Sequence, residues 1–341
     1  MKKTVIIIII TMLMVTIFNS PVFASSQHVK VAVSLGVFVP IVKDIGGTYA
    51  EVFSIVPPGV EPHEFILTPG VINEASLADL IIIDGHIEWE NKLLDAVSQA
   101  KDRPINNFSL NLINYSSNMT ILDMPSGSGL YGKNYHGYWL LPDNMKVIAR
   151  LIYERLSSID PAHSSYYNSN LQMFLDRVSF LENMLSKVRS LLNGKPVVLG
   201  FLEEDYIAYS MGLKVITVLS ASESPTANPN ALSLAYNMLK SEKGIIMVSD
   251  VAAEMPLYNS AVQLSKQTGA PLVTVDTTVN IDYVSAMMYN IGKVEGAISI
   301  ENIVPTSQVQ IVDPMLIFSV GLVGVIIVES VYIFRLRRLL K

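Results

Sequence analysis

Short apolar runs alternate with amphipathic stretches along most of this chain, and this alternation constrains its fold more than any other feature. In the first half, strands are predicted at residues 29–34, 51–56 and 80–84, and helices at residues 37–45, 70–77 and 90–100. In the second half, strands are predicted at residues 196–201, 213–218, 244–249 and 272–276, with helices at residues 204–211, 229–239, 257–268 and 283–294. Short apolar strands that alternate with helices are typical of parallel sheets covered on both faces. The sequence therefore predicts an α/β protein with two lobes built on mostly parallel sheets.

One long amphipathic helix is predicted between the two halves. After a helix over residues 143–156, apolar side chains recur at spacings of three and four from Leu171 to Val188, within the stretch 165–192. This spacing marks one buried stripe along a helix. The expected organisation is an N-terminal lobe over residues 29–150, a linking helix over residues 160–193 and a C-terminal lobe over residues 194–300.

Two apolar segments lie outside the predicted lobes. The first, residues 5–18, follows Lys2 and Lys3 and precedes Val22-Phe23-Ala24, which predicts a signal peptide over residues 1–24. The second, residues 315–334, has the length of a helix that spans a bilayer. The basic tail over residues 335–341 is then expected in the cytoplasm. This topology predicts a single-pass cell-membrane protein whose lobes lie outside the cytoplasm, with residues 301–314 as a spacer.

Charge and cysteine content exclude several kinds of partner and site. The chain has a formal net charge of −6 and contains no cysteine. A negative surface has the wrong sign for binding nucleic acid, so no nucleic-acid partner is expected. Without cysteine the chain has no disulfides, no thiolate metal ligands, no cysteine nucleophile and no site for a lipid on an N-terminal cysteine. The C-terminal apolar helix is therefore the expected tether to the membrane.

Histidine 63 lies in a stiff loop after the second predicted strand. Residues 57–62 contain three prolines, and His63 follows the last of them. Ligand sites of open α/β sheets lie at the carboxyl ends of the strands, and prolines lower the entropy lost when a side chain is held ready to bind. A lone histidine is also commonly structural, so a ligand and a structural role both remain open for this residue.

At this loop the chain resembles the metal-receptor family of ABC importers, the solute-binding proteins for zinc and manganese. The resemblance starts at Pro62-His63-Glu64-Phe65 with Thr68-Pro69 behind it. It continues in order through Ala78-Asp79-Leu80, Asp84-Gly85 and Glu88, then Trp139-Leu140, Pro142 and Asn144, Asp160-Pro161 with Tyr167 and Asn170, Tyr206 with Gly212-Leu213, and Thr268-Gly269-Ala270 with Asp276. The motifs cover almost all of residues 29–294 and are specific as a set.

The resemblance implies two lobes with a metal ion between them, held by three histidines and one carboxylate. His63 matches the first ligand and Asp276 the last. An ungapped match puts Gly137 at the second position, with His136 as its neighbour. A bulge of one residue would bring His136 into place, because one slip in extended backbone reverses the direction of a side chain.

At the third ligand position of the family stands Phe201, which has no lone pair to donate to a metal. Glu203 or Glu204, just past it at a predicted helix start, is expected to supply an oxygen instead. Both acids are also explained as charges that the helix dipole favours, so this alternative stays open. His86, near the end of its predicted strand, is more simply explained as pointing outward, although a direction toward the cleft stays open. The predicted set is His63, His136, Glu203 and Asp276.

A site with two histidines and two carboxylates suits Zn²⁺ or Mn²⁺. The resemblance therefore implies capture of one of these ions and delivery to an ABC permease, with the permease and its ATPase as separate chains. One alternative is a decayed metal site in which Phe201 and Gly137 line a cleft for a small organic ligand, or in which the lobes act as an adhesion or accessory surface. An enzyme is the least supported alternative, because no nucleophile or general base occurs at a recognisable spacing.

Overall fold

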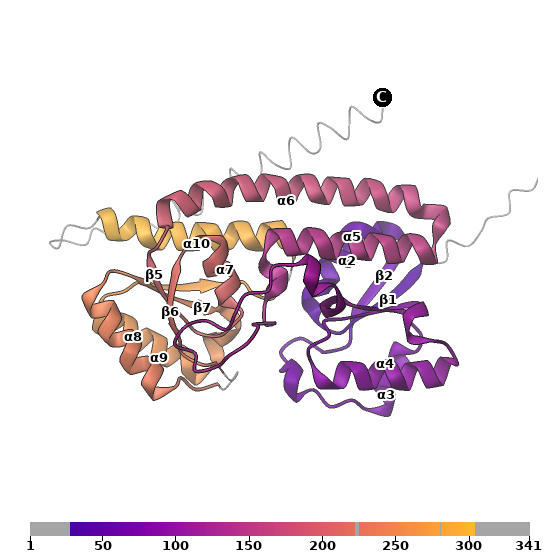
Figure 1. Cartoon of the computed structure of the whole chain (residues 1–341), viewed down its shortest axis with the longest axis horizontal. Coiled ribbons are helices and arrows are strands. Elements are labelled where there is room, and N and C mark those ends of the chain that lie inside the picture. Colours follow the sequence, from indigo (N-terminus) through magenta and orange to yellow (C-terminus); the bar gives the residue numbers. More distant parts are fainter. Residues whose placement is uncertain (1–27, 222–224, 280, 304–341) are drawn as a thin grey trace, which may run out of the picture.

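Two α/β lobes lie side by side beneath one long helix in the computed structural model, which describes residues 28–221, 225–279 and 281–303 (Figure 1). The predicted signal peptide, most of the predicted spacer, the C-terminal apolar segment and the basic tail lie outside the described residues. Within the described ranges, no helix is both long enough and apolar enough to cross a membrane.

The N-terminal lobe is built on a four-stranded parallel sheet in the order β2-β1-β3-β4. Its strands are β1 (Val29–Val33), β2 (Ala50–Ser54), β3 (Leu80–Ile83) and β4 (Ser109–Asn111). Its helices are α2 (Val39–Gly46), α3 (Pro69–Ala75), α4 (Glu88–Lys101) and α5 (Pro142–Ile159). All four side chains of β3 are buried, as expected for a central strand covered by helices on both faces. The sequence did not predict β4, because its three residues carry one buried apolar side chain, Leu110.

The C-terminal lobe repeats this topology with a parallel sheet in the order β6-β5-β7-β8. Its strands are β5 (Pro196–Leu199), β6 (Lys214–Val218), β7 (Ile245–Ser249) and β8 (Leu272–Val275). Its helices are α7 (Glu204–Ser210), α8 (Pro229–Ser241), α9 (Pro256–Thr268) and α10 (Tyr283–Ile303). The predicted α/β class with two parallel sheets is confirmed in both lobes.

Helix α10 ends later than predicted, at Ile303 rather than at residue 294. The buried side chains Met287, Ile291 and Val294 continue at the same spacing to Ile298, which is also buried. This apolar stripe keeps the helix packed on its lobe beyond the predicted end, so its last residues occupy the start of the predicted spacer.

The long helix α6 (Ser164–Leu192) crosses both lobes, which confirms the predicted linking helix (Figure 1). Its buried stripe packs against α2 and α5 of the N-terminal lobe and α10 of the C-terminal lobe. On the same helix, Arg177 pairs with Asp44 of α2 at 3.3 Å and with Asp282 just before α10. One helix thus connects the lobes through apolar packing and through a shared ion pair.

A second connection is made by the segment 119–140, which precedes α5 but binds the C-terminal lobe. The backbone N–H of Leu122 donates to the Tyr206 hydroxyl at 3.1 Å. The Trp139 indole donates to the carbonyl of Thr277 at 3.4 Å, and the Tyr283 hydroxyl donates to the carbonyl of Leu140 at 2.9 Å. These bonds hold the segment, and His136 within it, at the junction of the two lobes.

Candidate metal centre

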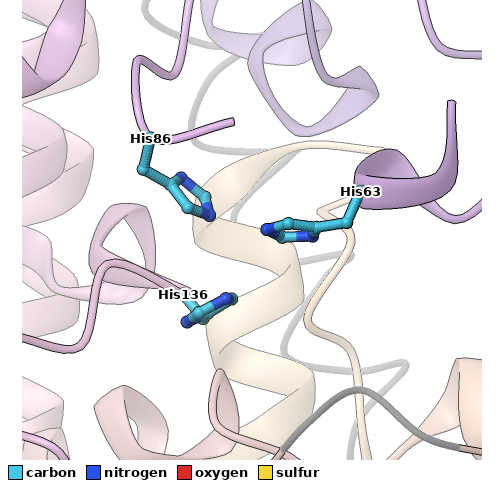
Figure 2. Close-up of side chains that lie close together, drawn as sticks. All are labelled: His63, His86 and His136. Atoms are coloured by element: carbon cyan, nitrogen blue, oxygen red, sulfur yellow. The ribbon is translucent and has the colours of Figure 1, made fainter. Parts of the chain in front are cut away.

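Three histidines from three separate segments meet at the junction of the lobes (Figure 2). His63, His86 and His136 each offer one ring nitrogen, and these nitrogens all lie within 4.8 Å of one another. The ring centroids are 5.2 Å apart for His63 and His86, 5.5 Å for His63 and His136, and 5.0 Å for His86 and His136. Figure 2 shows the three imidazoles turned toward a common centre.

His63 lies in a short 3₁₀ turn, Pro62–Glu64, that follows β2. The Trp89 indole of α4 donates to the carbonyl of Pro62 at 2.8 Å and fixes this turn against the N-terminal lobe. The Glu61 carboxylate accepts the backbone N–H of His63 at 3.1 Å and lies 3.4 Å from its Nδ1. The stiff loop predicted from the prolines therefore presents the ring with Nδ1 toward Glu61.

His86 follows β3, at the carboxyl end of a central strand of the sheet. Its Nδ1 is hydrogen-bonded to the fully buried carboxylate of Asp84, and its Nε2 is buried with no hydrogen-bond partner among the residues described. Burial alone would lower the pKa of His86, but the hydrogen bond and negative charge of Asp84 outweigh burial, and the pKa is raised. Of the two directions left open for this ring by the sequence, outward was preferred, and the structure instead turns the ring toward His63 and His136.

His136 lies in the segment that binds the C-terminal lobe, one residue before Gly137. The side chain of Asn134 is buried and accepts the backbone N–H of His136 at 3.0 Å, and the same oxygen lies 3.3 Å from Nδ1. Asn134 in turn donates to the carbonyl of Leu202 in the C-terminal lobe at 3.0 Å. Gly137 has a φ of 87°, in the left-handed region, and this turn directs the chain into the 3₁₀ helix over Tyr138–Leu140. Of the four predicted ligands, His136 therefore lies with His63, in a cluster whose third member, His86, was not in the predicted set.

The three rings share one arrangement, because each Nδ1 faces a side-chain oxygen of the residue two positions earlier. The pairs are Glu61 with His63, Asp84 with His86, and Asn134 with His136. A metal-ligating histidine commonly donates its second ring nitrogen to such an oxygen, which fixes the ring and strengthens it as a donor. Imidazoles that share one tetrahedral zinc ion, bound at about 2.0–2.1 Å, have ring centres on the order of 5 Å apart. The observed spacing fits a single ion.

The two carboxylates predicted as ligands lie outside this cluster. Within the described residues, the group of candidate ligands contains neither Asp276 nor Glu203. Asp276 follows β8, and its Oδ1 accepts the N–H of Thr278 at 2.9 Å, the hydroxyl of Thr278 at 3.0 Å and the N–H of Val279 at 2.9 Å. The backbone of Glu203 packs closely against Gly137. Oδ1 of Asp276 thus stabilises the turn that follows β8, whereas Oδ2 takes no part in these three hydrogen bonds.

Phe201 and Glu204 have structural roles in the C-terminal lobe. The Phe201 ring is 5% exposed and packs in an apolar cluster with residues of β5, β7 and α9. The fully buried Glu204 carboxylate accepts the backbone N–H groups of Phe201 and Ser249, at the ends of β5 and β7. Burial, together with the charge of Glu203, raises the pKa of Glu204 well above its ordinary value. The alternative that Glu204 supplies a metal-binding oxygen is therefore not supported.

His86 was left out of the predicted ligand set because the residue was weighed alone. The signal was present in the sequence: an acidic or amide residue stands two positions before each of the three histidines. In addition, Asp84 and His86 follow a run of four buried residues, so they lie at the same kind of strand end as His63.

Comparisons with known proteins agree with this fold. The family model described as zinc-uptake complex component A, periplasmic, matches residues 31–297, well over half of the chain. The chain is 23% identical over 292 residues to the metal ABC transporter substrate-binding lipoprotein ScbA of Streptococcus cristatus, covering 80% of this chain and 90% of that protein. It is 27% identical over 255 residues to the iron-binding protein YfeA of Yersinia pestis, covering 72% and 76%. The crystal structure of ZnuA matches with a TM-score of 0.65 at 20% identity, covering 79% of this chain and 99% of that one. The chain therefore belongs to the family of periplasmic zinc-uptake component A, the metal-binding substrate-binding proteins of ABC transporters.

Proposed function

We propose that this protein captures a divalent transition metal at His63, His86 and His136 and delivers it to an ABC permease driven by a separate ATPase. The observation that carries the proposal is the cluster itself: three ring nitrogens lie within 4.8 Å of one another, and each ring is oriented by an oxygen on Nδ1. Such convergence of imidazoles favours metal coordination over isolated structural roles. The matched family is named for zinc uptake, and the two relatives are named for metal transport and for iron binding.

The C-terminal lobe contributes the remaining coordination in this proposal. Asp276 is the better candidate of the two predicted carboxylates, because its Oδ2 is not used by the turn that Oδ1 builds. A carboxylate from one lobe and imidazoles from the other would couple metal capture to the position of the lobes. The linking helix α6 and the Arg177 ion pairs restrain that position, so the closing movement is small.

Elemental analysis and thermal unfolding of the purified full chain test the proposal. The wild type is expected to carry a stoichiometric transition metal, and His63→Ala is expected to lose it. Metal at about 100 times its dissociation constant should stabilise the wild type by about 2.7 kcal/mol and leave His63→Ala unmoved. His163→Ala is the matched control, because His163 also bonds a carboxylate, Asp160, at 2.7 Å but lies outside the cluster. If the wild type is purified without metal and its unfolding temperature does not change when Zn²⁺ or Mn²⁺ is added, the decayed-site alternative is supported instead.

The lobes work outside the cytoplasm in this proposal, held at the membrane by the apolar segment 315–334. Relatives are named as lipoproteins, whereas the present sequence has no cysteine to carry a lipid. An apolar span at the C-terminus would replace that anchor. A chain truncated before Met315 is expected to leave the membrane fraction and to keep its metal. Retention of the truncated chain in washed membranes would rule out this anchor.

A further inference from the structure

We infer that Asn107, Asn114 and Asn118 are acceptor sites for N-linked oligosaccharides on one edge of the N-terminal lobe. The inference goes beyond metal capture, and it rests on the proposed function only because that proposal places the lobes outside the cytoplasm. A serine or threonine stands two positions after each asparagine, in Asn107-Phe108-Ser109, Asn114-Tyr115-Ser116 and Asn118-Met119-Thr120. This spacing is the acceptor sequon for N-glycosylation, a modification of surface loops in secreted proteins. Every other asparagine of the chain lacks a serine or threonine at that spacing, so the sequons are confined to residues 107–120.

The first observation is that the structure exposes all three acceptors. Asn107 ends a short 3₁₀ turn before β4, and Asn114 and Asn118 lie in the 3₁₀ helix that follows β4. All three residues are exposed, and within the described residues no hydrogen bond engages their side-chain amides. Asn144 and Asn290, by contrast, are fully buried, and their amides donate to backbone carbonyls. An enzyme in solution or at the membrane can reach only the first group.

The second observation concerns the hydroxyl residues of the sequons, which differ in accessibility. Thr120 is exposed, and its backbone is held by Asn144, which accepts its N–H at 2.7 Å and donates to its carbonyl at 2.8 Å. Ser116 is half-buried, and Ser109 is half-buried inside β4, where it pairs with β3. The enzyme has to accommodate the hydroxyl residue together with the asparagine. Occupancy is therefore expected to fall from the third sequon to the first.

The modification is a group transfer from a lipid-phosphate-linked oligosaccharide, catalysed by a membrane oligosaccharyltransferase. Nδ2 of the asparagine forms a bond to the anomeric carbon of the first sugar, while the bond from this carbon to the phosphate oxygen of the donor breaks. The lipid phosphate leaves with the electron pair of that bond, and the amide gives up one proton, so nothing is oxidised or reduced. A lobe tethered to the membrane, as proposed above, stays close to both the donor and the enzyme.

The position of the sequons gives the sugars a protective role. β4 is the edge strand of the sheet β2-β1-β3-β4, with Asn107 before it and the other two asparagines after it. An edge strand can pair with another molecule, and proteins commonly cover or blunt such edges. Bulky, solubilising sugars at both ends of β4 would cover this one. The three asparagines lie outside the histidine cluster, so loss of the sugars should leave metal binding unchanged.

Mass spectrometry of the full chain purified from its own cells tests the inference. Trypsin should release all three sequons in one peptide, residues 102–133, because Lys101 and Lys133 bracket them and the bond between Arg103 and Pro104 resists trypsin. The wild-type peptide is expected to be heavier than its sequence by at least one oligosaccharide. Thr120→Ala should remove one oligosaccharide and Thr120→Ser should keep it, and both variants retain the backbone bonds of this residue.

A variant that combines Asn107→Gln, Asn114→Gln and Asn118→Gln separates the roles of the sugars from those of the metal site. It should lose every oligosaccharide from this peptide, bind metal as the wild type does, and form larger species than the wild type in sedimentation. Sedimentation like that of the wild type would overturn the protective role. A wild-type peptide with the mass of its bare sequence would overturn the inference, and stoichiometric metal in the same preparation would leave the proposed function standing. A glycosylated chain that binds no metal would overturn the proposed function alone.

Discussion

Gly137→Ala is expected to lower the free energy of unfolding by about 2–5 kcal/mol and to weaken metal binding at the same time. Gly137 has a φ of 87°, and a left-handed backbone costs a residue with a Cβ about 1–2 kcal/mol. An added Cβ would also lie 2.8 Å from the Cα of Glu203 and 2.9 Å from its carbonyl oxygen. Because both atoms belong to the backbone, the lobes themselves have to shift, and overpacking of this kind costs about 1–3 kcal/mol. The shift moves His136, one residue away.

Urea unfolding and Zn²⁺ titration of Gly137→Ala measure the two effects. Gly129→Ala is the matched control, because Gly129 has a φ of 76° and no atom within 4 Å of the added Cβ. Gly129→Ala should lower the free energy of unfolding only by the cost of a left-handed backbone at a residue with a Cβ, about 1–2 kcal/mol, and should leave metal binding intact. Equal destabilisation in the two variants would show that the contact between Gly137 and Glu203 contributes nothing.

Glu204→Ala is the second substitution with a large expected effect, about 4 kcal/mol of destabilisation. The Glu204 carboxylate bonds the backbone N–H groups of Phe201 and Ser249, which lie just past β5 and at the end of β7. Alanine leaves these two donors unpaired in the interior, at about 1–3 kcal/mol each. It also leaves a cavity at a fully buried position. Glu204→Gln keeps one acceptor oxygen of similar shape and should lose roughly half as much.

The same residue makes the stability of the protein depend on pH. Burial is the main cause that raises the pKa of Glu204 well above its ordinary value of 4.5, so the folded state keeps its proton at a pH where the unfolded chain has released it. The free energy of unfolding therefore falls as the pH rises above 4.5 and levels off once the folded group has ionised. Glu204→Gln cannot ionise, so its stability should fall less steeply over this range. Denaturant unfolding at a series of pH values measures the slope, and parallel curves for the wild type and Glu204→Gln would contradict the assignment.

The elements of the fold were predictable where local pattern and burial coincide. β3 is a run of four buried apolar residues, and the stripe on α6 repeats at helical spacing, so both are marked in the sequence. β4 and the last turns of α10 were not predicted. β4 forms mainly because it pairs with β3, and α10 continues because the side chain of Ile298 is buried against the rest of the lobe. Neither partner is visible from the local sequence.

The candidate site was predicted in part. His63 was identified from a proline-rich loop at a strand end, and His136 from its place beside Gly137, and the structure brings these two together. For His86 the outward direction was preferred over the cleft, because a single residue near the end of a strand carries no information about the direction of its ring. The bond from Nδ1 to the buried Asp84 turns the ring inward. That bond depends on how Ser34 and Glu90 hold Asp84.

By itself the sequence determined the α/β class, the two lobes and the helix between them, because hydrophobic periodicity is a local property of the chain. It also determined which residues have the chemistry to bind a metal, since five histidines and no cysteine are available. Only the tertiary structure decided which of them meet. His63, His86 and His136 lie on three segments separated by more than twenty residues each, and their approach depends on the parallel order of β2, β1 and β3 and on the bonds that hold residues 119–140 between the lobes. The directions of side chains across such distances are set by packing and hydrogen bonds, which no local pattern encodes.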